Sequence, residues 1–117
     1  MRPIQLPLFA IATLAACGGS ASDSPGANVS VYKYVGSVQC TGGGTALPAM
    51  QQQLAGAGIR VITASCGSDG NAYAAMCGAA DGRIGILEIP AAQAQAASAL
   101  GFAPLSSLPA ATKAACQ

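Results

Sequence analysis

The sequence contains no histidine and no tryptophan, and only 8% of its 117 residues are charged. In globular domains about a quarter of the residues are usually charged. Acid–base or covalent catalysis therefore has few groups to use, and serines such as Ser65 and Ser68 have no visible base. The five Lys and Arg nearly balance the four Asp and Glu, which leaves no basic footprint for nucleic acid. We expect a protein that is not an enzyme, needs no cofactor and binds no nucleic acid.

The sequence also lacks an apolar run long enough to cross a membrane as a helix, which takes about 18 to 20 residues. Its first sixteen residues carry one positive charge, Arg2, and end in a short, mainly apolar run over residues 8–16. This length and charge are typical of a secretory leader. We therefore expect residues 1–16 to be a signal peptide.

The leader ends in Leu14-Ala15-Ala16-Cys17, which resembles the lipobox of bacterial lipoproteins. In that family the small residues fit the signal peptidase and the cysteine sulfur carries a diacylglyceryl group, so the resemblance implies lipidation at Cys17. It also implies an envelope location, and Gly18, where an Asp would favour the inner membrane, implies the outer membrane facing the periplasm. The alternative is that Cys17 belongs to a buried helix.

Residues 17–28 contain the predicted lipidated cysteine and a Gly- and Ser-rich stretch without apolar periodicity. Such a stretch is typical of a flexible tether, here with a root-mean-square span of roughly 18 Å. A buried helix rarely opens directly into such a segment, which favours the anchor. Residues 29–117 then form one small domain.

Four cysteines remain once Cys17 is set aside, and an even number is typical of disulfides in an oxidising compartment. Their gaps of 26, 11 and 39 positions and the absence of His argue against zinc, and the absence of Cys-x-x-Cys argues against a redox-active dithiol. We expect two structural disulfides and no metal, with three pairings open. The four residues are Cys40, Cys66, Cys77 and Cys116.

The first half of the domain predicts a strand, a helix and a strand. Residues 29–39 are rich in β-branched and aromatic residues with period-two alternation, which is typical of a strand. Thr45 is expected to cap a helix that ends near Gly56 and Gly58. Residues 59–66 form the next strand, and this order suggests a right-handed parallel crossover. The apolar stripe of the helix is Leu47, Met50, Leu54 and Ala57.

Two similar Cys-Gly segments follow, each ending in Asp-Gly: Asp69-Gly70 and Asp81-Gly82. Asp-Gly indicates a two-residue hairpin turn in which both residues take positive φ. We therefore expect hairpin turns, with residues 72–77 as a short strand and 83–89 as a firm one. A calcium loop needs more oxygen ligands than this segment offers, so the Asp residues are expected to serve the local backbone.

Pro90 predicts the start of a second helix over residues 91–100, which Gly101 ends. Residues 102–117 are expected to wrap the surface irregularly until Cys116 fixes them. The whole is an α+β domain with two helices on one face of a mainly antiparallel sheet. The element order resembles a truncated ferredoxin-like (split βαβ) arrangement, with its last strand missing or replaced by the tail.

Two function classes remain after catalysis is set aside. The favoured one is a membrane-anchored, non-enzymatic envelope lipoprotein that is structural or binds another envelope protein. The alternative is a small inhibitor or ligand-binding module that presents the turns at residues 67–71 and 79–83. A third feature is the stretch Tyr32-Lys33-Tyr34, which offers aromatic and charged groups to a partner, although packing of one Tyr under the sheet explains it as well.

Overall fold

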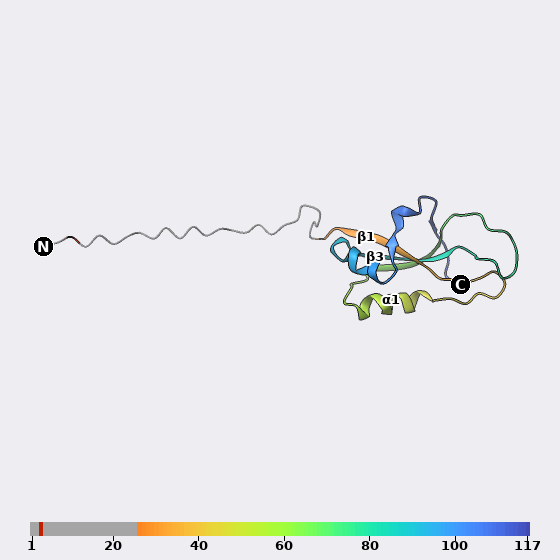
Figure 1. Ribbon diagram of the computed structural model, residues 1–117, viewed down its shortest axis with the longest axis horizontal. Coiled ribbons are helices and arrows are strands. Elements are labelled where there is room, and N and C mark those ends of the chain that lie inside the picture. The colour runs from red at the N-terminus through yellow and green to blue at the C-terminus, as the bar shows by residue number, and fades with distance from the viewer. Residues whose placement is uncertain (1–2, 4–25) are drawn as a thin grey trace.

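The computed structural model describes Pro3 and residues 26–117. The predicted leader and lipidation site, Cys17, lie outside the described residues. Figure 1 shows a sheet with α1 on one side of it. Two 3-10 turns, Ala91–Gln93 and Leu105–Ser107, accompany the regular elements. The regular elements are β1 (Asn28–Tyr34), α1 (Leu47–Gly56), β2 (Thr63–Ser68), β3 (Arg83–Pro90), α2 (Ala94–Ala99), β4 (Ala103–Pro104) and β5 (Thr112–Lys113).

The sheet has the strand order β4-β1-β3-β2-β5, and all neighbours are antiparallel. This confirms the expected α+β class with an antiparallel sheet. The strands on either side of α1 run in the same direction, but they are not neighbours, because β3 lies between them and pairs with both. β1 and β2 are therefore parallel strands joined through α1, as the predicted crossover requires, with β3 inserted between them. β3 is the most buried strand, so its apolar side chains gain most from the central place.

Both helices cover the same face of the sheet, as expected. Alternation along β3 points Leu87 and Ile89 to this face. There they join Met50 and Leu54 of α1 and Phe102, which follows α2, in one core cluster. Burial of such side chains stabilises the domain by about 1.5–3 kcal/mol each.

The other face of the sheet is covered by the chain after α2. This C-terminal segment, residues 103–117, pairs with the outer edge of β1 through β4 and with the outer edge of β2 through β5. Between them it crosses the face that carries Ile84 and Ile86, since a Cβ on Gly67 would meet both isoleucine side chains and the backbone of Thr112. Both isoleucines are buried. The tail is thus a second layer, more ordered than the irregular wrap expected.

Several predicted boundaries differ from the structure. β1 ends at Tyr34 rather than residue 39, and Gly36 takes a positive φ of 78° soon after it. β2 begins at Thr63 rather than residue 59, although Ile59 is buried in the core. Residues 72–77 are irregular, so the predicted short strand there is wrong.

The helix ends also differ from the predictions. The N-cap of α1 is Ala46, which makes no side-chain cap, instead of Thr45. The backbone N–H of Thr45 donates to Val35 (2.8 Å), which places this residue in the preceding loop. Ala57 is exposed as the C-cap rather than part of the buried stripe. The second helix is shorter than expected, because residues 91–93 form a 3-10 turn before α2.

Two disulfides link the four cysteines of the domain, which confirms that prediction. Cys40 pairs with Cys77 and Cys66 with Cys116, with Cα–Cα distances of 5.1 Å in both. The first joins two loops, and the second joins β2 to the last residues of the chain. Sequence alone left this pairing open, because three connectivities were equally compatible with the spacing.

Candidate functional site

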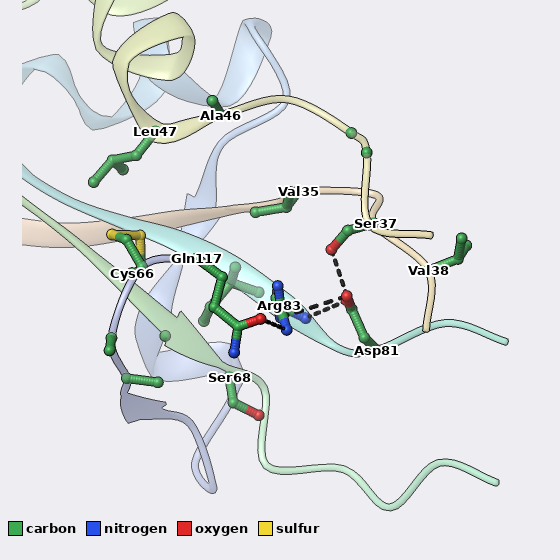
Figure 2. Close-up of a pocket in the computed structure, with 18 of the residues that line it drawn as sticks. Val35, Ser37, Val38, Ala46, Leu47, Cys66, Ser68, Asp81, Arg83 and Gln117 are labelled. Carbon is green, nitrogen blue, oxygen red and sulfur yellow. Dashed lines mark hydrogen bonds and ion pairs between the residues drawn. A yellow bond between two sulfur atoms is a disulfide. The ribbon is translucent and has the colours of Figure 1, made fainter. Parts of the chain in front are cut away.

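The candidate site is a groove at one end of the sheet, on the face that carries the helices. α1 begins over Gly85, where Met50 and Leu47 pack. Beyond that point no helix covers the sheet, and Ser68 and Arg83 pair there across β2 and β3. Figure 2 shows the space, which has a volume of about 1060 Å³. Its walls are the loop at residues 37–44, the start of α1 and the last residues 114–117.

The polar centre of the groove is an ion pair between Arg83 and Asp81. Arg83 Nε lies 3.5 Å from Asp81 Oδ2, and the same guanidinium donates to the side chain of Gln117 (Figure 2). Ser37 Oγ donates to the carboxylate of Asp81 at 2.6 Å. Burial by itself raises the pKa of Asp81. The hydrogen bonds from the Ser37 hydroxyl and the Arg83 backbone, together with the charge of Arg83, outweigh this effect, so that the pKa of Asp81 lies below its ordinary value. The charged side chains of the groove thus form one pair of opposite charges.

Backbone donors line the wall beside this pair. Gly42, Gly43 and Gly44 all have positive φ, between 72° and 86°, a conformation that glycine adopts without steric cost. The N–H groups of Gly43, Gly44 and Ala46 have no hydrogen-bond partner among the described residues. All three residues are exposed and line the groove, so unpaired backbone donors belong to its wall.

A cluster around Gln39 holds the loop at residues 37–44 against the β2–β3 loop, residues 69–82. The Gln39 amide donates to the carbonyls of Ala74 (2.7 Å) and Ala80 (3.2 Å) and accepts from the N–H of Met76 (3.1 Å). Its backbone bonds both Ala79 (2.9 Å) and Gly78 (3.0 Å). The Cys40–Cys77 disulfide ties the same two loops covalently. Sequence reasoning placed Gln39 at the end of a strand and missed this role.

A second polar cluster lies on the opposite face of the sheet, around Asp69, which is only 1% exposed. Its carboxylate accepts hydrogen bonds from the Tyr34 hydroxyl (3.0 Å), from the Tyr73 hydroxyl and from the backbone N–H of Asn71 (2.9 Å). Asp69 and Asp81 do not have the positive φ that a two-residue Asp-Gly turn needs. The expected hairpin turns are therefore wrong, although both carboxylates do accept from the local backbone, Asp69 from Asn71 and Asp81 from Arg83.

The ionisation of this cluster follows from its hydrogen bonds. Burial by itself raises the pKa of Asp69, but the bonds from Tyr73, Asn71 and Tyr34 outweigh it and leave its pKa below 3.8. Burial, and then the bond to the Asp69 carboxylate and its charge, raise the pKa of Tyr34 from 10.0 to about 12. The pKa of Tyr73 is raised as well, first by the same carboxylate.

Acid should destabilise the domain through Asp69. Because its folded-state pKa is below the unfolded value of 3.8, the ionised group stabilises the fold above about pH 5, and this contribution is lost as the pH falls below 3.8 and through the lowered folded-state pKa. We expect Asp69→Asn to cost about 1–3 kcal/mol at neutral pH and to flatten this acid slope. Urea titrations between neutral pH and pH 3 measure both. Glu88→Gln serves as the matched loss of one carboxylate, and equal acid slopes in wild type and Asp69→Asn would contradict the prediction.

Alkali should act through Tyr34. A raised pKa means that the neutral hydroxyl stabilises the fold, so this contribution is present below pH 10.0 and is lost as the pH rises toward about 12. The ultraviolet absorbance of tyrosinate should show a late ionisation that Tyr34→Phe removes. We expect that variant to cost about 1 kcal/mol, because the Tyr34 side chain is partly in solvent. An unchanged titration curve in the variant would rule out this assignment.

The stretch Tyr32-Lys33-Tyr34 does not form one surface. Tyr32 and Tyr34 stack edge to face (5.6 Å between ring centroids) on the face of the C-terminal segment. Lys33 points to the helix face, where its ammonium donates to Gln53 (3.0 Å) and to the carbonyl of Leu100 (3.1 Å) and lies 5.0 Å from the Phe102 ring centre. The alternation of a strand separates neighbours in this way.

The two serines considered at the sequence level lie on opposite faces of β2. Ser65 pairs with Ile86, and Ser68 pairs with Arg83 at the groove. The Ser68 hydroxyl accepts from the N–H of Gly70 (3.3 Å), and neither serine has a side-chain base as a hydrogen-bond partner among the described residues. Ser68 therefore contributes a polar side chain to the lining of the groove.

Comparison with protein-family models, curated proteins and solved structures finds no match for this chain. Within residues 26–117 and Pro3, no helix has the length and hydropathy to span a bilayer. In the same part of the chain, no three Cys, Asp or Glu side chains gather as a set of metal ligands.

Proposed function

We propose that this protein is a lipid-anchored component of a bacterial cell envelope, held at Cys17, whose disulfide-linked domain is a non-enzymatic binding module. The groove is the observation that carries the binding role. Its volume of about 1060 Å³ lies just above the range of roughly 300–1,000 Å³ that is usual for small-molecule pockets. It therefore has room for a segment of a partner protein.

The chemistry of the groove supports a peptide segment as its ligand. Arg83 and Asp81 neutralise one another, so the side chains of this pair offer no net charge to a polyanion or a polycation. The free N–H groups of Gly43, Gly44 and Ala46 match the carbonyls of an extended chain. Val35, Val38 and Leu47 supply an apolar wall beside them. A neutral, hydrogen-bonding segment of another envelope protein fits this combination best.

A small-ligand or inhibitor module is the second candidate, and one observation favours it. The two Gly-rich segments, residues 67–71 and 79–83, both reach the groove, through Gly67 and Ser68 from the first and Asp81 and Arg83 from the second. Polar groups from separate loops that converge on one cavity are typical of small-molecule sites. The same experiments distinguish the two candidates.

The proposal also includes the finer fold assignment, a variant of the split βαβ arrangement. Its support is the insertion of β3 between β1 and β2, together with the position of β4 beside β1. The two residues of β4 take the place of a full last strand, and the extra strand β5 closes the other edge. The C-terminal segment thus occupies the edge position beside β1 that a full last strand would take.

The anchor is tested by Cys17→Ser in cells, followed by fractionation. We expect the wild-type protein to be processed and recovered with membranes, and the variant to remain unprocessed. Mass spectrometry of the wild-type amino terminus checks the same point. An amino terminus at Met1 without a fatty acid would refute the anchor while leaving the groove untested by that result.

The groove is tested by a photo-crosslinking amino acid at Thr41, which is exposed on its rim, with Gln52 on the outer face of α1 as the control position. We expect an envelope-protein adduct from position 41 only. Ser68→Trp, which fills the groove, should abolish the adduct, and Thr63→Trp, on the same strand outside it, should not. An adduct that still forms in the Ser68→Trp variant would contradict the groove as the binding site. If the groove is found to bind only a small molecule, the second candidate is favoured.

A further inference from the structure

The two disulfides lie in different surroundings. Cys40 and Cys77 are both exposed, and both belong to irregular loops. Cys66 is half-buried within β2, where it pairs with Gly85, and its carbonyl accepts from Ala114 (2.9 Å). Only its partner, Cys116, is exposed. Access to the sulfurs sets the rate at which a thiolate attacks a disulfide, so the Cys40–Cys77 bond is open from both ends and the other from one.

The backbone of Cys40 adds a second difference. Its φ of 72° is the only left-handed value of a non-glycine residue in the described chain. An L-residue meets a steric penalty in this region and stays there only where its surroundings hold it. The bond to Cys77 is one of the restraints that hold Cys40. Cleavage of that bond therefore allows its backbone to relax.

The part of the fold that this disulfide holds is limited. It joins the loop at residues 37–44 to the loop at residues 69–82, and the other ties between them are the hydrogen bonds of the Gln39 cluster, the bond from Ser37 to Asp81 and the bridge between Val38 and Ala80. Residues 71–78 are exposed throughout. The pairing of β3 with β1 and β2 and the Cys66–Cys116 bond do not involve these loops. Loss of the Cys40–Cys77 bond should therefore open the loops without unfolding the sheet.

We propose that the Cys40–Cys77 disulfide is a thiol-exchange site, and that its reduction by a dithiol loosens the loop wall of the groove. A thiolate of the dithiol attacks one sulfur of the pair; the Cys40–Cys77 bond breaks, a mixed disulfide forms, and the other cysteine leaves as a thiolate that takes up a proton. The second thiol of the reductant, as its thiolate, then attacks the mixed disulfide. This releases the second cysteine and leaves the reductant oxidised to its own disulfide, a two-electron exchange.

The consequence for the groove follows from its lining. Cys40 and the residues on both sides of it, from Val38 to Gly44, form one wall. In the oxidised protein this wall is held in place, and in the reduced protein it is free to move away from the β2–β3 loop. The effect on ligand binding rests on the proposed function, whereas the exchange itself does not.

Stepwise reduction of the full chain with dithiothreitol tests the proposal. Thiols are trapped with an alkylating reagent at increasing times and assigned by peptide mapping, which separates Cys17 from the domain cysteines. We expect Cys40 and Cys77 to be labelled at least about tenfold faster than Cys66 and Cys116. At the stage where only the first pair is reduced, amide hydrogen exchange should rise in residues 36–46 and 70–81 and stay unchanged in β3.

Variants provide the matched comparison. Cys40→Ser with Cys77→Ser should reproduce the exchange pattern of the partly reduced protein, and Cys66→Ser with Cys116→Ser should leave residues 36–46 protected if that variant folds. The chemical reduction gives a result whether or not either variant folds. Simultaneous labelling of all four cysteines, earlier labelling of Cys66 and Cys116, or loss of protection in β3 as Cys40 and Cys77 are reduced would each overturn the proposal. All of these readouts are independent of a groove ligand.

Discussion

Gly85→Val should destabilise the domain by about 3 kcal/mol or more, which is a large part of the 5–15 kcal/mol that holds a typical domain together. Gly85 lies in the central strand β3 directly beneath α1, and a Cβ there would collide with the Met50 sulfur and press on Leu47. The valine can be accommodated only if the side chains of Met50 and Leu47 are displaced. Because Met50 is fully buried, this displacement disturbs the core between α1 and β3.

Urea denaturation followed by circular dichroism measures the loss at Gly85. Gly56→Ala is the matched control, because Gly56 is exposed at the end of α1, has no positive φ and has open space around its Cβ position. Alanine there should stabilise the protein by about 0.5–1 kcal/mol. Similar effects at the two glycines would contradict the packing described for α1.

Removal of the Cys66–Cys116 disulfide, by replacing both residues with alanine, should cost about 4 kcal/mol. The bond closes a loop of 50 residues, and the loop-closure entropy that it removes from the unfolded chain grows with that length. It also fixes residues 114–117 along the groove. We therefore expect a lower stability together with a mobile C-terminal end.

Thermal and urea unfolding under non-reducing conditions measure this cost. Gln117→Ala, which removes only the side chain that accepts from Arg83, serves as the control for the C-terminal end and should change the stability by less than about 1 kcal/mol. A double-alanine variant as stable as the wild type would show that β5 pairing alone holds the segment. The exchange of residues 112–117 with solvent would then also stay unchanged.

The parts of the fold that were predictable from sequence are those that local periodicity or a simple residue count indicates. The stripe through Met50 and Leu54 indicates α1 because those positions share one side of a helix, and both side chains are buried. Alternation along residues 29–34 likewise indicates β1, and the even number of domain cysteines indicates two disulfides. Each of these signals lies within a short window or a simple count.

The parts that were missed depend on contacts between distant residues. Asp69 looked like a turn residue because Gly70 follows it, yet one of the hydroxyls that determine its role belongs to Tyr34, 35 positions away. Gln39 carried no signal at all, since glutamine is common on surfaces and its partners are backbone groups of residues 74–80. Gly82 is buried beside Asp69, and a Cβ there would meet the Asp69 carboxylate. The sequence contains this glycine, but only the structure shows that the cluster requires it.

The groove was likewise not foreseeable from a motif, because its lining comes from four separate segments. Of its lining, the turns at residues 67–71 and 79–83 were singled out beforehand as presented loops, whereas Cys40, Cys66 and Cys116 were interpreted only as disulfide partners. Gly43 and Gly44 line the groove where Thr45 bonds back to Val35, just before α1 starts at Leu47. The position of a helix start thus decides whether such a loop is a connection or a contact surface.

The direction of β1 determines where the groove stands relative to the anchor proposed at Cys17. β1 starts at Asn28, next to the predicted tether, and its seven residues extend over about 23 Å before the chain turns into the groove loop. In a chain held by lipid, this strand acts as a spacer that carries the groove to the far side of the domain from the bilayer. A partner could then reach it from the aqueous side without approaching the lipid headgroups.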